Sequence, residues 1–272
     1  MTNHHQYYSF LRKMSLTKQR YSHIKNWRKS FPNNNVDLVK YWYKTSWKNT
    51  IDISIIKTIE KSLSEEMTKT NKEFFPYPSL VFNAFKTTSF EDVKVVFIGQ
   101  DPYPNYEEYK DRVVPQGMGL CFSVADEMRI PASLKNIYEN LYNFNHISKI
   151  PISGNLTSWA QQGCLMINAT LSVISNEINS HEHIWKKFTD NIIKYISDNK
   201  DFVIFVIWGK NAFDKLGLID LDKHDAIISS HPSPNSFAKS FRSYNAFKDC
   251  DHFGSINNKL KEKSLKEIDW KL

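Results

Sequence analysis

Four short apolar runs mark the middle and the end of the chain. They are nearly continuous, rich in β-branched residues, and cover residues 93–99, 164–173, 202–209 and 225–230. Such runs are typical of strands that are buried on both faces. Apolar positions at helical spacing lie between them, in 134–142 and 185–196, and before them, in 51–67. This alternation predicts an α/β fold with a central parallel four-stranded sheet and helices on both faces.

Polar residues stand at the carboxyl ends of these expected strands. Gln-Asp-Pro-Tyr-Pro, with Asp101 and Tyr103, follows the first run, Lys210 follows the third, His231 follows the fourth, and Asn168 lies within the second. Ligands of an open parallel sheet bind beyond the carboxyl ends of its strands, so we expect the active site there. Taken singly, the proline-rich segments are also typical of rigid turns, and Asn168 of a buried amide that stabilises the core. Their shared position at one sheet edge favours an acid-base and hydrogen-bonding site.

Composition excludes several classes of protein. The 272 residues are 41% hydrophobic, with only 8 Gly and 10 Pro, which is typical of one globular domain and not of a low-complexity chain. No apolar run reaches the length of a membrane span, and no secretory h-region precedes the first strand. The three cysteines are scattered and form no CxxC motif, which argues against a disulfide framework and a zinc ribbon. We therefore expect an intracellular protein in a reducing compartment, with no membrane attachment.

The net charge of +7 is concentrated near the N-terminus. Residues 1–50 hold ten Lys or Arg against one acidic residue, Asp37, whereas the other 222 residues hold 26 basic and 28 acidic side chains. Three asparagines at 33–35 read as a polar linker. We expect a basic N-terminal extension over 1–50 and a catalytic domain over 51–272. The charge itself is equally consistent with a solvated leader, a targeting signal or DNA binding.

Five segments in one order resemble the motifs of the family 1 uracil-DNA glycosylases. They are GQDPYP at 99–104, QGMGLCFSV at 116–124, PASLKNIY at 131–138, WAQQGCLMINATLSV at 159–173 and HPSPNS at 231–236. The resemblance implies base excision repair by hydrolysis of the bond between uracil and deoxyribose, which leaves an abasic site. The target nucleotide must then be rotated out of the duplex into a pocket. The resemblance implies neither a metal nor a cofactor, and uracil-containing DNA, single- or double-stranded, as the partner.

The resemblance assigns roles to six residues. Asp101 stabilises the cationic sugar and orients the attacking water, and a neutral His231 donates a hydrogen bond to the departing base. Asn168 matches the donor and acceptor pattern of uracil and refuses cytosine. Tyr103 excludes the methyl group of thymine by bulk. Phe122 is expected to stack on the flipped ring. Gln100 is expected to contact the water and the base.

Other matched positions point to DNA contacts. Ser133, Ser233 and Ser236 correspond to serines that bind phosphates, although they also fit ordinary turns. Lys210 stands where a serine is usual and is expected to contact phosphate as a point charge. Asn235 stands where the family commonly has a leucine wedge, so we expect weaker duplex binding and a preference for single-stranded substrate. Phe237 is the alternative wedge.

Further departures from the family pattern leave alternatives open. Pro104 and Met118 stand where histidines are common in the family. The segments 105–115 and 236–249 are longer than usual, and we expect 105–115 to fold away from DNA.

A non-catalytic DNA-binding or polymerase-associated subunit is the main alternative function, and a glycosylase for thymine or damaged bases is the next. His181 and His183 lack companions for a metal site. We expect a monomer that meets replication or repair proteins, in the nucleus or mitochondrion of a eukaryote, or in the virion or host cell of a virus.

Overall fold

The structure is a computed structural model that describes residues 15–272. Its centre is a four-stranded parallel sheet in the order β5 (Cys164–Asn168), β2 (Val95–Gly99), β7 (Ile204–Trp208) and β8 (Asp225–Ser229). Every residue of β2, β5 and β7 is buried, which explains their nearly continuous apolar sequences. The predicted α/β fold is confirmed.

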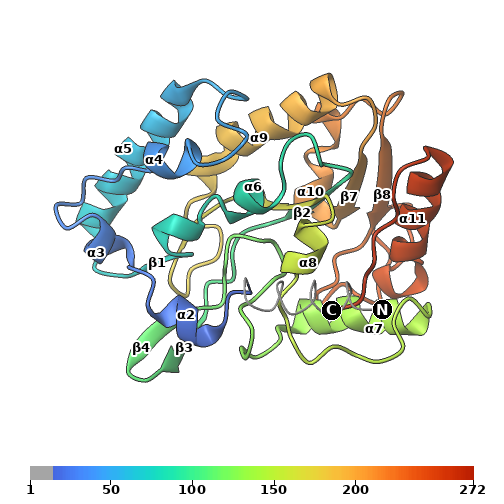
Figure 1. The fold of residues 1–272 in the computed structure, drawn as a ribbon, viewed down its shortest axis with the longest axis horizontal. Helices are drawn as coiled ribbons and strands as arrows, with labels where there is room; N and C mark the ends of the chain where they lie inside the picture. The colour runs from blue at the N-terminus through green and yellow to red at the C-terminus, as the bar shows by residue number, and fades with distance from the viewer. Residues whose placement is uncertain (1–14) are drawn as a thin grey trace, which may run out of the picture.

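Helices cover the sheet on both sides. Figure 1 shows α5 (Ile53–Lys69) and α9 (Glu182–Asn199) on one side and α11 (His252–Glu262) on the other, with α7 (Ala132–Asn143) beneath. The apolar face of α9 is wholly buried and packs against α5. Among the described residues, no helix is both long and apolar enough to cross a membrane.

Shorter elements complete the fold around the sheet. The predicted strand over 164–173 divides in two, because β5 ends at Asn168 and β6 (Val173–Ile174) pairs antiparallel with β1 (Phe74–Phe75). The short α-helices are α6 (Asn83–Thr87), α8 (Thr157–Ala160) and α10 (Lys210–Phe213), and the 3-10 turns are η1 (Pro78–Leu80), η2 (Leu216–Leu218) and η3 (Phe247–Asp249). Helix α10 begins directly after β7, so it lies at the carboxyl edge of the sheet.

The expected boundary at residue 51 differs from the observed packing. Residues 18–42 form α2 (Lys18–Ser22), α3 (Trp27–Ser30) and α4 (Val39–Trp42), and their large aromatic side chains belong to the same core as the sheet. Trp27 donates from Nε1 to the Pro76 carbonyl at 2.9 Å, and Trp47 donates to the Thr88 carbonyl at 2.9 Å. From residue 15 onward, the expected extension is therefore packed against the rest of the chain and shares its core. The number of charged residues in this segment gave no indication of its buried apolar side chains. Residues 1–14 lie outside the described part of the chain.

The segment expected to fold away from DNA forms a hairpin against the N-terminal region. Strands β3 (Tyr106–Tyr109) and β4 (Arg112–Pro115) pair antiparallel. Lys18 Nζ lies 2.6 Å from Glu107 Oε2, and Arg112 donates to the Ser22 carbonyl at 3.2 Å. The acidic residue Glu107 is thus paired with a cation of α2.

Candidate active site

A cavity of about 500 Å³ opens at the carboxyl edge of the sheet. All eleven residues predicted for the site line it, although they come from segments far apart in the chain. They are Gln100, Asp101, Tyr103, Phe122, Ser133, Asn168, Lys210, His231, Ser233, Asn235 and Ser236. The structure therefore brings the predicted constellation together, as the parallel topology implies.

Asp101 lies two residues beyond β2 and is held by a loop before α9. Its Oδ2 accepts a hydrogen bond from the Asn179 backbone N–H at 2.7 Å. The neighbouring Gln100 donates from Nε2 to Asn179 Oδ1 at 2.6 Å. Burial raises the pKa of Asp101 above its usual range, and the Asn179 N–H works in the opposite direction because it stabilises the charged form.

His231 follows β8, and its ring has a defined tautomer. The Ser233 backbone N–H donates to His231 Nδ1 at 3.0 Å, so in the neutral ring the hydrogen is on Nε2. Burial lowers the pKa of His231 to about 4, which agrees with the neutral imidazole expected from the sequence. Gly209 allows this close approach, since a Cβ there would lie 2.8 Å from the Cβ of His231.

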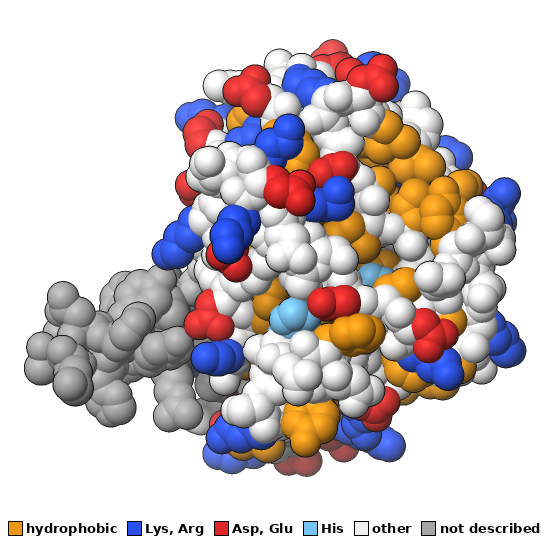
Figure 2. Space-filling model, turned by 90° about the vertical axis from the view of Figure 1, so that its right-hand side faces the viewer, with side chains coloured by type: hydrophobic (Ala, Val, Ile, Leu, Met, Phe, Trp, Pro, Cys, Tyr) orange, Lys and Arg blue, Asp and Glu red, His pale blue; other side chains and the backbone are white. Residues whose placement is uncertain are grey.

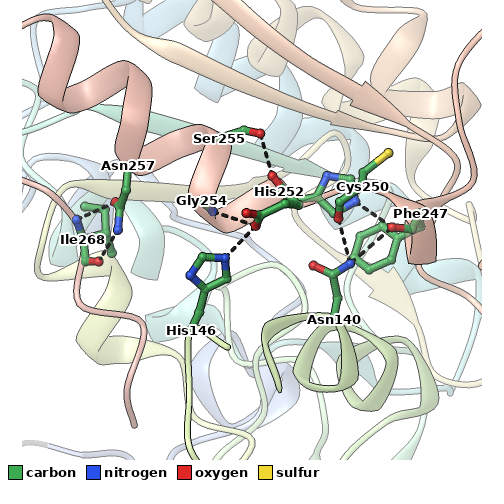
Figure 3. Close-up of polar contacts among 10 residues, drawn as sticks. Asn140, His146, Phe247, Cys250, His252, Gly254, Ser255, Asn257 and Ile268 are labelled. Atoms are coloured by element: carbon green, nitrogen blue, oxygen red, sulfur yellow. Dashed lines mark hydrogen bonds and ion pairs between the residues drawn. The ribbon is translucent and has the colours of Figure 1, made fainter. Parts of the chain in front are cut away.

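The loop that carries His231 is held by α7 and by the segment after it. Asn136 donates from Nδ2 to the Pro232 carbonyl at 2.7 Å. One turn further along α7, Asn140 donates to the Cys250 carbonyl at 2.9 Å (Figure 3). The Phe247 N–H in turn donates to Ser230 Oγ at 2.8 Å. These bonds fix the loop on two sides and so limit where the imidazole can lie.

Asn168 ends β5 directly opposite Gly99 of β2. A Cβ at Gly99 would come within 2.2 Å of Asn168 Oδ1, so only glycine leaves room for this amide. Asn168 is buried and lines the cavity, as a residue that recognises a small polar ligand must.

Two aromatic side chains form another part of the wall. Tyr103 donates from its hydroxyl to the Phe122 carbonyl at 3.2 Å, and burial raises the pKa of this phenol. Phe122 has a left-handed backbone, with φ of 62°, and its ring centroid lies 5.8 Å from that of His231. Tyr103 is thereby bonded to the segment that carries the Phe122 ring.

The polar residues of the rim come from three segments. Ser133 lies in the first turn of α7, whereas Ser233, Asn235 and Ser236 belong to the loop after β8. Lys210 begins α10, and its Nζ lies 2.8 Å from Asp214 Oδ2 in an exposed ion pair. Ion pairs this exposed contribute little to stability in water.

Phe237, His181 and His183 lie in different environments. Phe237, the alternative wedge, is half-buried and packs against Phe247 with ring centroids 5.8 Å apart. His181 is buried with Nδ1 2.9 Å from Ser172 Oγ, whereas His183 is exposed. No group of three His, Cys, Asp or Glu in residues 15–272 is arranged to hold a metal.

Sequence reasoning missed Asn179 and Ile178. Asn179 bonds both Gln100 and Asp101, and Ile178 lines the cavity although it is exposed. They lie in an irregular loop, where neither strand nor helix periodicity gives a signal. A further lining residue, Trp208, was expected only as the end of a strand.

Comparisons with known proteins identify the family. A model of the uracil DNA glycosylase superfamily matches residues 85–261. A probable uracil-DNA glycosylase of Acanthamoeba polyphaga mimivirus is 38% identical over 265 residues, which cover 92% of this chain and 70% of the relative. A uracil-DNA glycosylase of Francisella philomiragia is 45% identical over 202 residues, 74% of this chain and 86% of the relative. The crystal structure of the mimivirus uracil-DNA glycosylase superposes with a TM-score of 0.87 at 36% identity, and the match covers 95% of this chain and 97% of the viral one. The chain belongs to the uracil-DNA glycosylase superfamily, as its motifs indicated.

Proposed function

We propose that the cavity binds a uracil rotated out of DNA and that Asp101 and His231 perform the hydrolysis. Family membership gives the activity itself: the chain hydrolyses the N-glycosidic bond of deoxyuridine in DNA and releases free uracil. The observation that carries our assignment of roles is the meeting of Asp101, His231 and Asn168 in one cavity.

Asp101 acts on the sugar side of the reaction. When the bond between C1′ and the uracil nitrogen breaks, its electron pair leaves with the base and the sugar becomes an oxocarbenium ion. The Asp101 carboxylate stabilises this cation and accepts a hydrogen bond from the water whose oxygen attacks C1′. The water proton is released through Asp101, so a carboxylate held by the Asn179 N–H serves as both electrostatic partner and general base.

His231 acts on the base side. Negative charge accumulates on a uracil oxygen as the bond breaks, and the Nε2–H of a neutral imidazole donates to it. A neutral donor stabilises this anion without giving up its proton early. Because the Ser233 N–H occupies Nδ1, the ring presents Nε2 as its donor.

Base recognition uses the remaining lining residues. The Asn168 amide donates to O4 and accepts from N3–H of uracil, whereas cytosine presents the reverse pattern. Tyr103 occupies the space of a thymine methyl group, Phe122 stacks on the ring, and Gln100 contacts the water and base. The selectivity for uracil is thus set by hydrogen bonds at one edge of the ring and by steric exclusion at another.

The rim positions the DNA strand. Ser133, Ser233 and Ser236 donate to phosphates, and Lys210 exchanges Asp214 for a phosphate. Asn235 is exposed at the mouth and is a poor apolar wedge, so it favours single-stranded over duplex substrate.

The deciding experiment measures release of free uracil from uracil-containing DNA in the presence of a chelator. We expect release by the wild-type chain and a loss of about a hundredfold or more in kcat for Asp101→Asn or His231→Gln, because each removes a preorganised charge or donor worth about 3 kcal/mol or more. Unchanged melting temperatures would confirm that both variants fold. If either variant kept wild-type turnover, our assignment of that residue would be wrong. Without uracil release, a DNA-binding role would replace the enzymatic one.

A further inference from the structure

Ile178 is an apolar side chain exposed at a polar rim. Eight large apolar side chains are exposed in the described chain, and Ile178 is the one among them that lines the cavity, with 65% of its surface accessible. The rim residues named above are serines, an asparagine and a lysine. An exposed isoleucine in the lining of the cavity is within reach of a ligand there and offers it an apolar contact.

The loop that carries Ile178 is fixed in shape. Asn176 and Asn179, on either side of Ile178 in the chain, both have left-handed backbones, with φ of 63° and 59°. Ser180 Oγ donates to the Glu177 carbonyl at 3.0 Å and accepts from the Ile174 N–H at 2.8 Å. The exposed side chain therefore stands on a rigid support, as expected of a binding contact.

The same loop is attached to the catalytic segment at two points. The Asn176 N–H donates to the Pro104 carbonyl at 2.9 Å, and the Asn179 N–H donates to Asp101 Oδ2 at 2.7 Å. Ile178 is thus the direct neighbour of the residue that holds the carboxylate. This places it on the sugar side of the cavity.

We propose that Ile178 contacts DNA by packing against a deoxyribose of the uracil strand next to the flipped nucleotide. The proposal rests on the proposed function, in which Asp101 faces the sugar of that nucleotide. A deoxyribose lacks the 2′-hydroxyl and so presents an apolar edge, which matches an isoleucine better than a serine or lysine. Ile178 supplies binding energy from the strand itself, so it serves single-stranded and duplex substrates alike.

The test compares Ile178→Ser with Ile178→Leu and with a matched control, Ile152→Ser. Ile152 is 98% exposed and lies outside the cavity lining, so its substitution makes the same change at an even more exposed position away from the site. Steady-state kinetics are measured on a single-stranded and a duplex oligonucleotide of the same sequence. For Ile178→Ser we expect KM to rise about fivefold on both substrates, with kcat within about twofold of wild type, because only part of an isoleucine surface loses its contact. Ile178→Leu and Ile152→Ser stay near wild type.

Three outcomes would overturn the proposal. Unchanged KM means that the side chain does not touch DNA. A loss confined to duplex substrate means that Ile178 enters the base stack, and a fall in kcat alone means that it acts through Asn179 on Asp101. Fluorescence anisotropy with the same strands compares affinities without turnover. Failure of the Ile178 contact is thereby distinguished from failure of the proposed chemistry.

Discussion

Asn168 and Tyr103 are held so firmly that base choice should respond to small changes. Asn168 Oδ1 lies against Gly99, and the Tyr103 hydroxyl is bonded to the Phe122 carbonyl. Asn168→Asp presents an acceptor where the amide presented a donor, so we expect it to begin excising cytosine while uracil excision falls about a hundredfold. Tyr103→Ala opens space for a methyl group and should admit thymine.

These changes are measured by base release from oligonucleotides that contain uracil, cytosine or thymine at one position. The wild-type chain should release uracil alone. If neither substitution relaxed the choice of base, the recognition surface would lie elsewhere in the cavity.

Asn179 offers a test of how the carboxylate is tuned. Its N–H lowers the pKa of Asp101 against the effect of burial, and its backbone φ of 59° suits glycine but strains alanine by about 1 kcal/mol. Asn179→Gly should keep the N–H in place and retain the wild-type acid limb of kcat/KM. Asn179→Ala should weaken the bond and raise the pKa of Asp101, so activity is lost at a higher pH on acidification. Identical pH profiles for the two variants would show that this loop does not tune Asp101.

At the scale of elements, the N-terminal helices are a structural part of the domain. The Trp42 ring packs edge-on against Phe82, Phe85 and Phe188, with centroids 5.1, 5.3 and 5.4 Å away. Trp42→Ala should lower the free energy of unfolding by about 3–5 kcal/mol because it empties this cluster. Tyr43→Ala, at the adjacent exposed position, should change it by less than about 0.5 kcal/mol. Urea denaturation measures both, and equal effects would mean that α4 does not contribute to the core.

The elements also show why sequence reasoning succeeded in one place and failed in another. β2, β5 and β7 are buried on both faces, so their apolar runs are unambiguous. The helices at 18–42 are only four or five residues long, too short to display a helical period, and their exposed lysines dominate the composition. Their burial depends on partners far along the chain, such as the Pro76 carbonyl that accepts from Trp27.

The residues of the site also divide into some that the sequence predicted and others that it did not. Residues directly after strands, such as Asp101 and His231, were predictable because parallel topology fixes where strand ends meet. Ile178 and Asn179 were not, since their positions depend on the conformation of a loop that no periodicity describes. The motif resemblance assigned roles to the former pair and was silent on the latter.

At the scale of the whole molecule, charge is distributed more evenly than the chain's N-terminal excess suggests. Figure 2 shows basic and acidic side chains interspersed over one face of the protein. Within the basic segment, Lys18 pairs with Glu107 and Lys40 with Asp37. Part of the N-terminal charge therefore supports packing, and the cations that remain exposed are available to a polyanion.

Buried histidines couple the stability of the whole molecule to pH. Burial lowers the pKa of His181 and His252 to about 4, as it does that of His231 in the cavity. His252 accepts from Trp208 Nε1 at 3.3 Å through Nδ1 and donates from Nε2 to the Phe247 carbonyl at 3.0 Å, so protonation would break the first bond. His181 Nε2 is buried without a partner among the described residues. The folded chain therefore favours the neutral form of both rings.

The sign of the pH effect follows from which state takes up protons first. Above pH 6.5 these histidines are neutral in the folded and unfolded chain and add no pH dependence; between pH 6.5 and about 4, the unfolded chain alone binds their protons. The free energy of unfolding should fall over this window by up to about 3 kcal/mol per histidine.

Three buried carboxylates have the opposite effect on stability. Burial raises the pKa of Asp101, Glu60 and Glu73, so these groups bind protons first in the folded state. The histidine contribution sets in as the pH falls below 6.5, so the urea midpoint should fall there, and the three carboxylates make this slope smaller. His252→Gln, which cannot titrate, should flatten this slope even if it lowers stability at pH 7, and equal slopes for the wild type and His252→Gln from pH 7 to 5 would refute the coupling.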